Sequence, residues 1–177
     1  LEEVYKGLGE MQTLASGVGD LKKVLTNVKS RGIWGEMQLG ALLAQVLSPN
    51  QYEENVAVKP GGGERVEFAL RLPGRQEAGE QPVYLPIDSK FPQEAFVRLL
   101  EAQEQGDVEK TAEGRKALAQ VLRVEAKRIS EKYIAPPYTT DFAVLFLPLE
   151  GLYAEVMRDM NLVEETQRKL RVVIAGP

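Results

Sequence analysis

Residues 64–74 (ERVEFALRLPG) and 83–90 (VYLPIDSK) decide the fold of this chain. In the first stretch apolar and polar residues alternate strictly, which is typical of a strand with one buried face, and Glu67 lies on its polar face. The polar loop between the two stretches is bounded by proline and glycine, so we expect the chain to turn back as a hairpin. Pro86 indicates an irregular or edge position near the end of the second strand. These stretches therefore predict two antiparallel strands.

The rest of the chain predicts an α/β domain whose central mixed sheet starts with antiparallel strands and is flanked by helices. Apolar runs and alternation predict further strands over residues 52–59, 142–148 and 171–176. Helical spacing of apolar residues predicts the helices, over residues 31–47, 93–107, 107–133 and 150–161. In the longest helix an apolar stripe is expected to face the sheet, formed by Leu118, Leu122, Ala126, Ile129 and Tyr133.

Residues 1–30 predict a separate coiled-coil helix, so the expected organisation is a coil over 1–30 and an α/β domain over 31–177. Seven of the eight heptad seam positions are apolar, counting Val4, Met11, Val18 and Leu25 on one seam and Gly7, Leu14, Leu21 and Val28 on the other. A coiled coil would make the protein a homo-oligomer. The alternative is a long amphipathic helix that lies on its own domain.

Composition excludes several classes of chemistry. The chain has 177 residues, no cysteine and no histidine, which removes thiol nucleophiles, disulfides, Cys/His zinc sites and Ser–His mechanisms. Carboxylates remain as metal ligands, and they suit hard cations such as Mg²⁺ or Mn²⁺. The net charge of -4 argues against wholesale coating of nucleic acid but permits a local basic groove. The chain has no membrane-spanning run, begins without Met and is interpreted as a piece of a longer protein, with any membrane anchor upstream.

Four residues form a candidate catalytic site. Alternation places Asp88 and Lys90 on one face of a strand, and cross-strand partners lie about 5 Å apart, so Glu67 can meet Asp88. Glu36 precedes the apolar helical positions of its own helix and is expected to reach the same place. Three carboxylates can bind Mg²⁺, and the metal together with one ammonium can catalyse phosphodiester cleavage. Each residue also has an ordinary explanation: a strand-end ion pair, a solvated strand residue, or a first-turn glutamate that interacts with the helix dipole.

A second polar stripe, on the long helix, is a candidate DNA-binding surface. Its members are Lys116, Gln120, Arg123 and Lys127, which could follow a phosphate backbone. A solvated helix face explains the same pattern.

The sequence resembles the RmuC family of DNA recombination proteins from about residue 30 to the end. Five blocks carry the resemblance, in order RGIWGEMQLGALL, RVEFALRLPG, LPIDSKFPQEAF, EKYIAPPYTTDFAVLFLPLEGLYAEV and RVVIAGP. The resemblance implies a restriction-endonuclease-like core of the PD-(D/E)xK type that acts on DNA and limits rearrangements at inverted repeats. It also implies a cytoplasmic protein, which in many members is anchored in the membrane by a region ahead of the coiled coil.

The resemblance assigns roles by position. Asp88 and Lys90 match the acid-x-Lys element, Glu67 takes the place of the preceding acid, and Glu36 matches an acidic helix residue ahead of the core strands. Many relatives have Arg-Pro-Asp at residues 65–67, so Glu67 is one methylene longer than the residue it replaces, which affects a tight Mg²⁺ site.

We therefore expect a Mg²⁺- or Mn²⁺-dependent deoxyribonuclease without an organic cofactor. Glu36, Glu67 and Asp88 would hold the metal, and Lys90 would position the attacking water. The rival hypothesis is a non-catalytic DNA-binding or scaffolding module assembled through the coiled coil, and a third is a purely structural coiled-coil protein.

Overall fold

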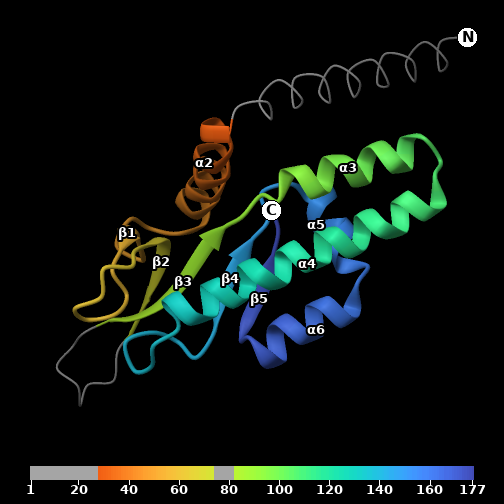
Figure 1. Cartoon of the computed structure of the whole chain (residues 1–177). Helices are drawn as coiled ribbons and strands as arrows, with labels where there is room; N and C mark the ends of the chain where they lie inside the picture. Colours follow the sequence, from red (N-terminus) through yellow and green to blue (C-terminus); the bar gives the residue numbers. More distant parts are fainter. Residues whose placement is uncertain (1–27, 74–81) are drawn as a thin grey trace, which may run out of the picture. The chain divides into compact units, whose positions relative to one another are not determined.

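The computed structural model describes residues 28–73 and 82–177 (Figure 1). The chain divides into two compact units, Leu1–Trp34 and Gly35–Pro177. The predicted coiled coil over residues 1–30 lies almost entirely outside the described residues. All of the described strands belong to the second unit.

A five-stranded mixed sheet forms the centre of this unit, in the order β1-β2-β3-β4-β5. Its strands are β1 (Tyr52–Val56), β2 (Val66–Leu72), β3 (Val83–Ser89), β4 (Ala143–Phe146) and β5 (Val172–Ala175). The first three strands pair antiparallel and the last three parallel, which confirms the predicted hairpin and the mixed α/β sheet. β3 is thus the central strand and joins the two halves.

The expectation for Pro86 was wrong, because this proline lies inside the central strand, opposite Ala69 of β2. Pairing of β3 with β4 begins only at Ile87, which lies opposite Val144. Proline has no backbone N–H to donate, but at this position β3 makes no hydrogen bond to β4. The strand therefore accommodates the proline without losing a hydrogen bond to β4.

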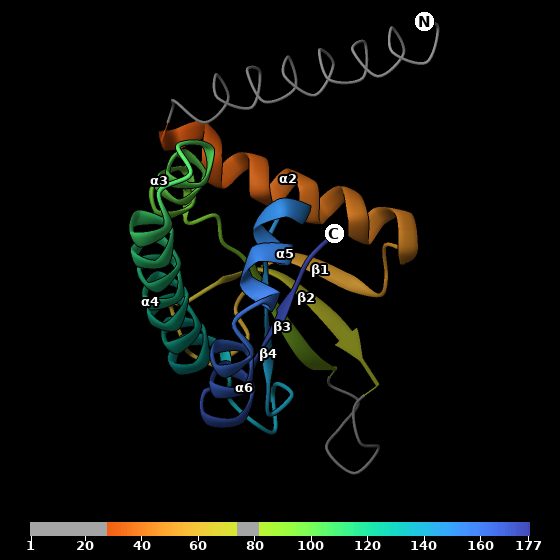
Figure 2. The same ribbon diagram turned by 90° about the vertical axis from the view of Figure 1, so that its right-hand side faces the viewer.

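Five helices accompany the sheet in the part of the chain that the structure describes (Figures 1 and 2). They are α2 (Val28–Val46), α3 (Gln93–Glu104), α4 (Val108–Tyr133), α5 (Glu150–Met157) and α6 (Met160–Lys169). The predicted helix over 150–161 ends at Met157, and a second helix that the sequence did not predict runs from Met160 to Lys169. Asp159 starts the second, since its side chain accepts a hydrogen bond from the N–H of Leu162 at 3.0 Å, as a helix N-cap does.

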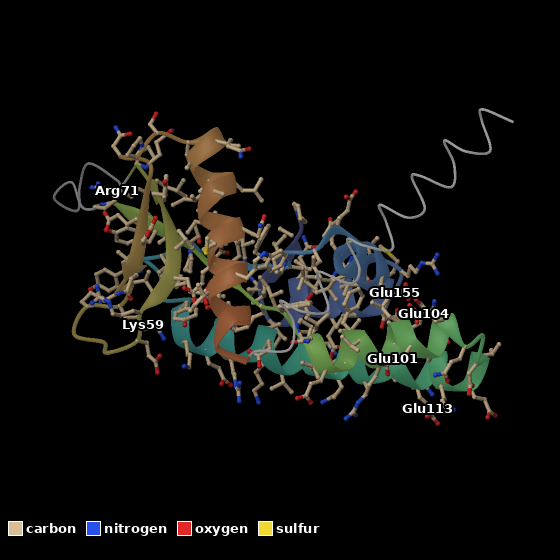
Figure 3. All side chains as sticks on the ribbon, turned by 90° about the horizontal axis from the view of Figure 1, so that it is seen from above. Lys59, Arg71, Glu101, Glu104, Glu113 and Glu155 are labelled. Atoms are coloured by element: carbon tan, nitrogen blue, oxygen red, sulfur yellow. The ribbon has the colours of Figure 1, made fainter. Side chains whose placement is uncertain are left out.

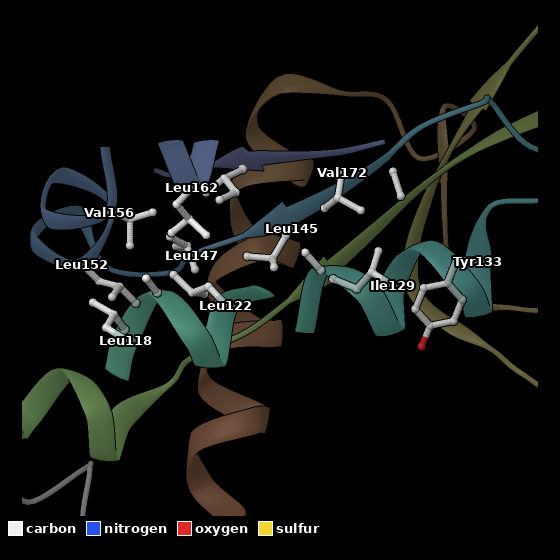
Figure 4. Packing of buried hydrophobic residues seen from close by; sticks show 14 of the residues in the cluster. Leu118, Leu122, Ile129, Tyr133, Leu145, Leu147, Leu152, Val156, Leu162 and Val172 are labelled. Atoms are coloured by element: carbon white, nitrogen blue, oxygen red, sulfur yellow. The ribbon is translucent and has the colours of Figure 1, made fainter. Parts of the chain in front are cut away.

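Two apolar clusters hold the unit together, one on each face of the sheet. Successive strand residues point to opposite faces, so Leu145 packs toward α4 and Phe146 toward α2. The cluster under α4 is the larger, and Figure 4 shows its packing. All five residues of the apolar stripe predicted for α4 are buried in it, namely Leu118, Leu122, Ala126, Ile129 and Tyr133.

Among the described residues, no helix combines the length and the apolar character that crossing a membrane requires.

Candidate active site

Three of the four predicted site residues come together where β2 and β3 lie side by side. The register places Phe68 opposite Ile87, and one step further along the same register Glu67 faces Asp88. Lys90 follows the end of β3, and its Nζ lies 2.5 Å from Asp88 Oδ2 and 4.0 Å from Glu67 Oε1. One ammonium therefore faces two carboxylates, which we call the carboxylate pair (Glu67 and Asp88).

The backbone of β3 fixes the orientation of Glu67. Its Oε2 accepts a hydrogen bond from the N–H of Ser89 at 2.8 Å. Asp88 itself points into the sheet face covered by α4 and is only 2% exposed. The side chains of Glu67 and Lys90 remain 23% and 31% exposed, so the site opens to solvent on their side.

The carboxylate pair carries more negative charge than Lys90 neutralises. Burial, followed by the charge of Asp88, raises the pKa of Glu67 to about 7 against the opposing effects of the Ser89 N–H and Lys90. Burial also raises the pKa of Asp88, although Lys90 opposes it. Burial lowers the pKa of Lys90, but the attraction of Asp88 and Glu67 is greater and the net pKa is raised. The side chain of Lys90 is therefore protonated and positively charged at neutral pH.

Glu36 does not join the carboxylate pair, contrary to the sequence expectation. Gly35 and Leu39, four residues apart, are the buried positions of α2 at this point, and Glu36 lies about 100° further round the helix, where it is exposed. Among residues 28–73 and 82–177, no three acidic side chains are arranged to hold a metal ion. The charge of Glu36 is only the smallest of the effects that raise the pKa of Glu67.

The polar stripe proposed for DNA lies on the flank of α4 that faces α6. Arg123 Nε pairs with Glu165 Oε2 of α6 at 2.8 Å. Lys127 Nζ lies 3.8 Å from Glu131 Oε1 within α4. Lys116 and Gln120 are exposed. The charges with the largest effects on the pKa values of the carboxylate pair belong to residues outside this stripe.

Comparison with known proteins gives the family. The model of the RmuC family matches residues 1–177. This chain belongs to the RmuC family. Proteins from two strains of Xylella fastidiosa, Temecula1 / ATCC 700964 and 9a5c, each named DNA recombination protein RmuC homolog, are 56% identical over 177 residues, which is 100% of this chain and 39% of each relative. A Chlamydia pneumoniae protein of the same name is 29% identical over 179 residues, covering 99% of this chain and 39% of the relative.

The chain thus spans about two fifths of the length of these RmuC homologs, 39% in each case. No solved structure matches it.

Sequence reasoning missed one acidic residue, Glu125, that affects the carboxylate pair of this RmuC family member. Glu125 of α4 acts electrostatically on both Asp88 and Lys90, raising the pKa of each. Its side chain is 18% exposed and pairs with Arg128 Nη1 at 3.0 Å. A signal was available, since Glu125 follows Leu122 by three positions and precedes Ile129 by four, which places it beside the buried stripe.

Two further groups border the site from the end of α4. Burial, then Asp88, Glu64 and Glu67, raise the pKa of the Tyr133 hydroxyl to about 12. Lys132 Nζ pairs with Glu64 Oε2 at 3.1 Å, and its charge favours ionised Asp88. The last two turns of α4 therefore form one wall of the site.

The site fits a divalent cation through two protein carboxylates. Both members of the carboxylate pair have a raised pKa, and the ammonium of Lys90 is shared between them at 2.5 Å and 4.0 Å, so a bound cation would offset negative charge that one ammonium does not fully balance. Mg²⁺ is commonly held by one or two carboxylates together with water and substrate phosphate. A third acidic ligand is thus not needed for the chemistry that the sequence predicted.

Proposed function

We propose that this domain is a restriction-endonuclease-like core that hydrolyses DNA phosphodiesters with a bound Mg²⁺ or Mn²⁺ ion. The observation that carries the proposal is the position of the Lys90 ammonium between two carboxylates from paired strands. Its Nζ lies 2.5 Å from Asp88 Oδ2 of β3 and 4.0 Å from Glu67 Oε1 of β2. Family membership and the names of the relatives support DNA as the substrate and recombination as the process. The limiting of rearrangements at inverted repeats is part of the proposal and follows from the sequence resemblance.

Glu67 and Asp88 would hold the cation, which when bound would acidify a water molecule and stabilise the phosphate oxygens. Lys90 has a raised pKa, so at neutral pH it acts as a fixed positive charge rather than as a base. Its ammonium orients the attacking water and stabilises the charge that develops on the scissile phosphate. The N–H of Ser89, which donates to Glu67 Oε2 at 2.8 Å, holds this carboxylate in position.

A non-catalytic DNA-binding module is the second candidate. One observation favours it: Lys90 already pairs with Asp88, and among the described residues no group of three acids could hold a metal. In this case the carboxylate pair would be a structural ion-pair network. In either case, we propose that the heptads of residues 1–30 associate copies of the chain.

Cleavage of a plasmid in Mg²⁺ or Mn²⁺ by the wild-type chain and by Lys90→Ala tests the enzyme proposal. We expect the variant to lose cleavage, because the ammonium that stabilises the transition state is gone, while circular dichroism shows an unchanged fold. Lys169→Ala is the matched control, since it removes a lysine that is 75% exposed and belongs neither to the carboxylate pair nor to the polar stripe of α4, and it should cleave normally. Equal cleavage by Lys90→Ala and the wild type would refute the assignment.

Calorimetric titration with Mn²⁺ separates the two candidates. The enzyme proposal expects a binding heat that disappears in Asp88→Asn, because the amide replaces a charged ligand. A wild-type chain that gives no heat at millimolar Mn²⁺ supports the non-catalytic module instead.

A further inference from the structure

The two flanks of α4 have different neighbours. An α-helix turns about 100° per residue, so Glu125, Arg128 and Lys132 share the flank on one side of the buried stripe, whereas Arg123 and Lys127 lie on the other. Glu125 and Lys132 act electrostatically on Asp88, while Arg123 pairs with Glu165 of α6. Asp88 lies opposite Leu145 of β4, whose side chain packs in the cluster under α4, so the carboxylate pair is on the sheet face that α4 covers. We call the first flank the site flank (Glu125, Arg128 and Lys132).

The site flank presents two exposed cations, each held by an acid. Arg128 Nη1 lies 3.0 Å from Glu125 Oε1, with 64% of the arginine side chain exposed. Lys132 Nζ lies 3.1 Å from Glu64 Oε2, with 45% of the lysine side chain exposed. Ion pairs with exposed cations are weak, so a phosphate can replace the carboxylate at little cost.

The loop between β1 and β2 is tied to the same end of α4. Lys59 Nζ donates to the carbonyl oxygen of Glu131 at 2.7 Å, and Glu64 reaches Lys132 from the same loop. The far end of the α3–α4 hairpin is different: Figure 3 shows Glu101, Glu104 and Glu113 gathered there, away from Lys59. These acidic side chains make that end a less favourable approach for a polyanion than the C-terminal half of α4, where Lys59, Arg128 and Lys132 lie.

We propose that Arg128 and Lys132 bind neighbouring phosphates of the DNA strand that enters the carboxylate pair; this inference rests on the proposed function. Their positions differ by four residues, so the two side chains are neighbours on the helix surface, about 6 Å apart at Cβ. Arginine binds phosphate oxygens with two parallel hydrogen bonds, and lysine binds them as a point charge. Such contacts position the strand and carry no sequence information.

Salt dependence of DNA binding tests the proposal. Binding of a fluorescent duplex to the full chain is followed by anisotropy in EDTA, where no cleavage occurs, across a range of salt concentrations. The double variant Arg128→Gln/Lys132→Gln should bind more weakly, and the slope of log affinity against log salt should fall by about 2, one for each lost phosphate contact. Two duplexes of unrelated sequence should give the same result.

Arg123→Gln/Lys127→Gln is the matched control. It removes two positive charges from the opposite flank of the same helix and likewise breaks two ion pairs with glutamates, Glu165 and Glu131; Glu165 keeps Lys169 at 3.9 Å. Its salt slope should equal that of the wild type. The proposal is overturned if both double variants lose affinity equally or if only the control loses it. A wild-type chain that does not bind DNA at all overturns the proposed function as well, which distinguishes the two failures.

Discussion

At the scale of single residues, burial competes with charge pairing around the carboxylate pair. Asp88 has an ammonium 2.5 Å away and yet its pKa is raised, because removal of a carboxylate from water outweighs one nearby positive charge. Glu67 feels the same burial together with the negative charge of Asp88. Such a site costs stability in the absence of a cation, as sites built for binding often do.

Glu67→Gln should therefore stabilise the fold, and more so at high pH. The pKa of Glu67 is raised from 4.5 to about 7, so the folded state favours the protonated acid and loses stability as the pH rises through 7. Glutamine mimics the protonated form and still accepts the Ser89 N–H bond. We expect the gain in unfolding free energy to be up to about 2 kcal/mol larger at pH 8 than at pH 5. Urea unfolding in EDTA measures it, and a gain independent of pH would contradict the explanation.

At the scale of elements, the close approach of α2 to β3 places the site strand. Gly35 of α2 is buried, and a Cβ added there would lie 2.8 Å from Ser89 Oγ and 3.5 Å from Pro148 Cγ. Ser89 is the residue between Asp88 and Lys90, and its N–H binds Glu67. A glycine on one helix thus permits the packing that sets the geometry of the carboxylate pair.

Gly35→Ala and Gly32→Ala form a matched pair in the same helix. Alanine favours a helix by about 1 kcal/mol over glycine, and a Cβ at Gly32 meets no atom within 4 Å, so Gly32→Ala should stabilise the protein by up to that amount. In Gly35→Ala the new Cβ would overlap with Ser89 Oγ, which offsets the gain in helix propensity. This variant should therefore be less stable than Gly32→Ala by about 1–3 kcal/mol. Urea unfolding measures the free energy of unfolding of both variants. Equal values would show that the Ser89 side chain can move away from the added Cβ without loss of stability.

At the scale of the whole molecule, the α/β unit contains its own core. Both apolar clusters are built from residues between Leu39 and Ile174, within the unit Gly35–Pro177. For the heptads of residues 1–30, association between copies is the use that their pattern predicts.

A chain of residues 28–177 should fold and be monomeric, whereas the full chain self-associates. We expect the same urea midpoint for both, measured at low concentration, because the two clusters are intact in the shorter chain. Light scattering after gel filtration gives the masses. If the full chain and the shorter chain are both monomers, the coiled coil is refuted. If both form oligomers with the same number of copies, the interface lies in the α/β unit.

The sequence by itself determined the elements and one essential pairing. Alternation with a period of two and helical spacing are local signals, so they predicted all five strands, the apolar stripe of α4 and the hairpin whose register sets Glu67 opposite Asp88. Helix α6 was missed: the last predicted helix ended at residue 161, whereas Asp159 caps a new helix that runs to Lys169.

The tertiary structure decided which residues surround the carboxylate pair. Glu36 and Glu125 both lie beside the apolar positions of a helix, yet Glu36 is exposed and affects the pKa of Glu67, whereas Glu125 is partly buried and affects both Asp88 and Lys90. Helical periodicity shows which face is buried but not how the helix is rotated over the sheet. That rotation depends on non-local packing, such as the contact of Gly35 with Ser89, and it alone selects the flank of each helix that meets the site.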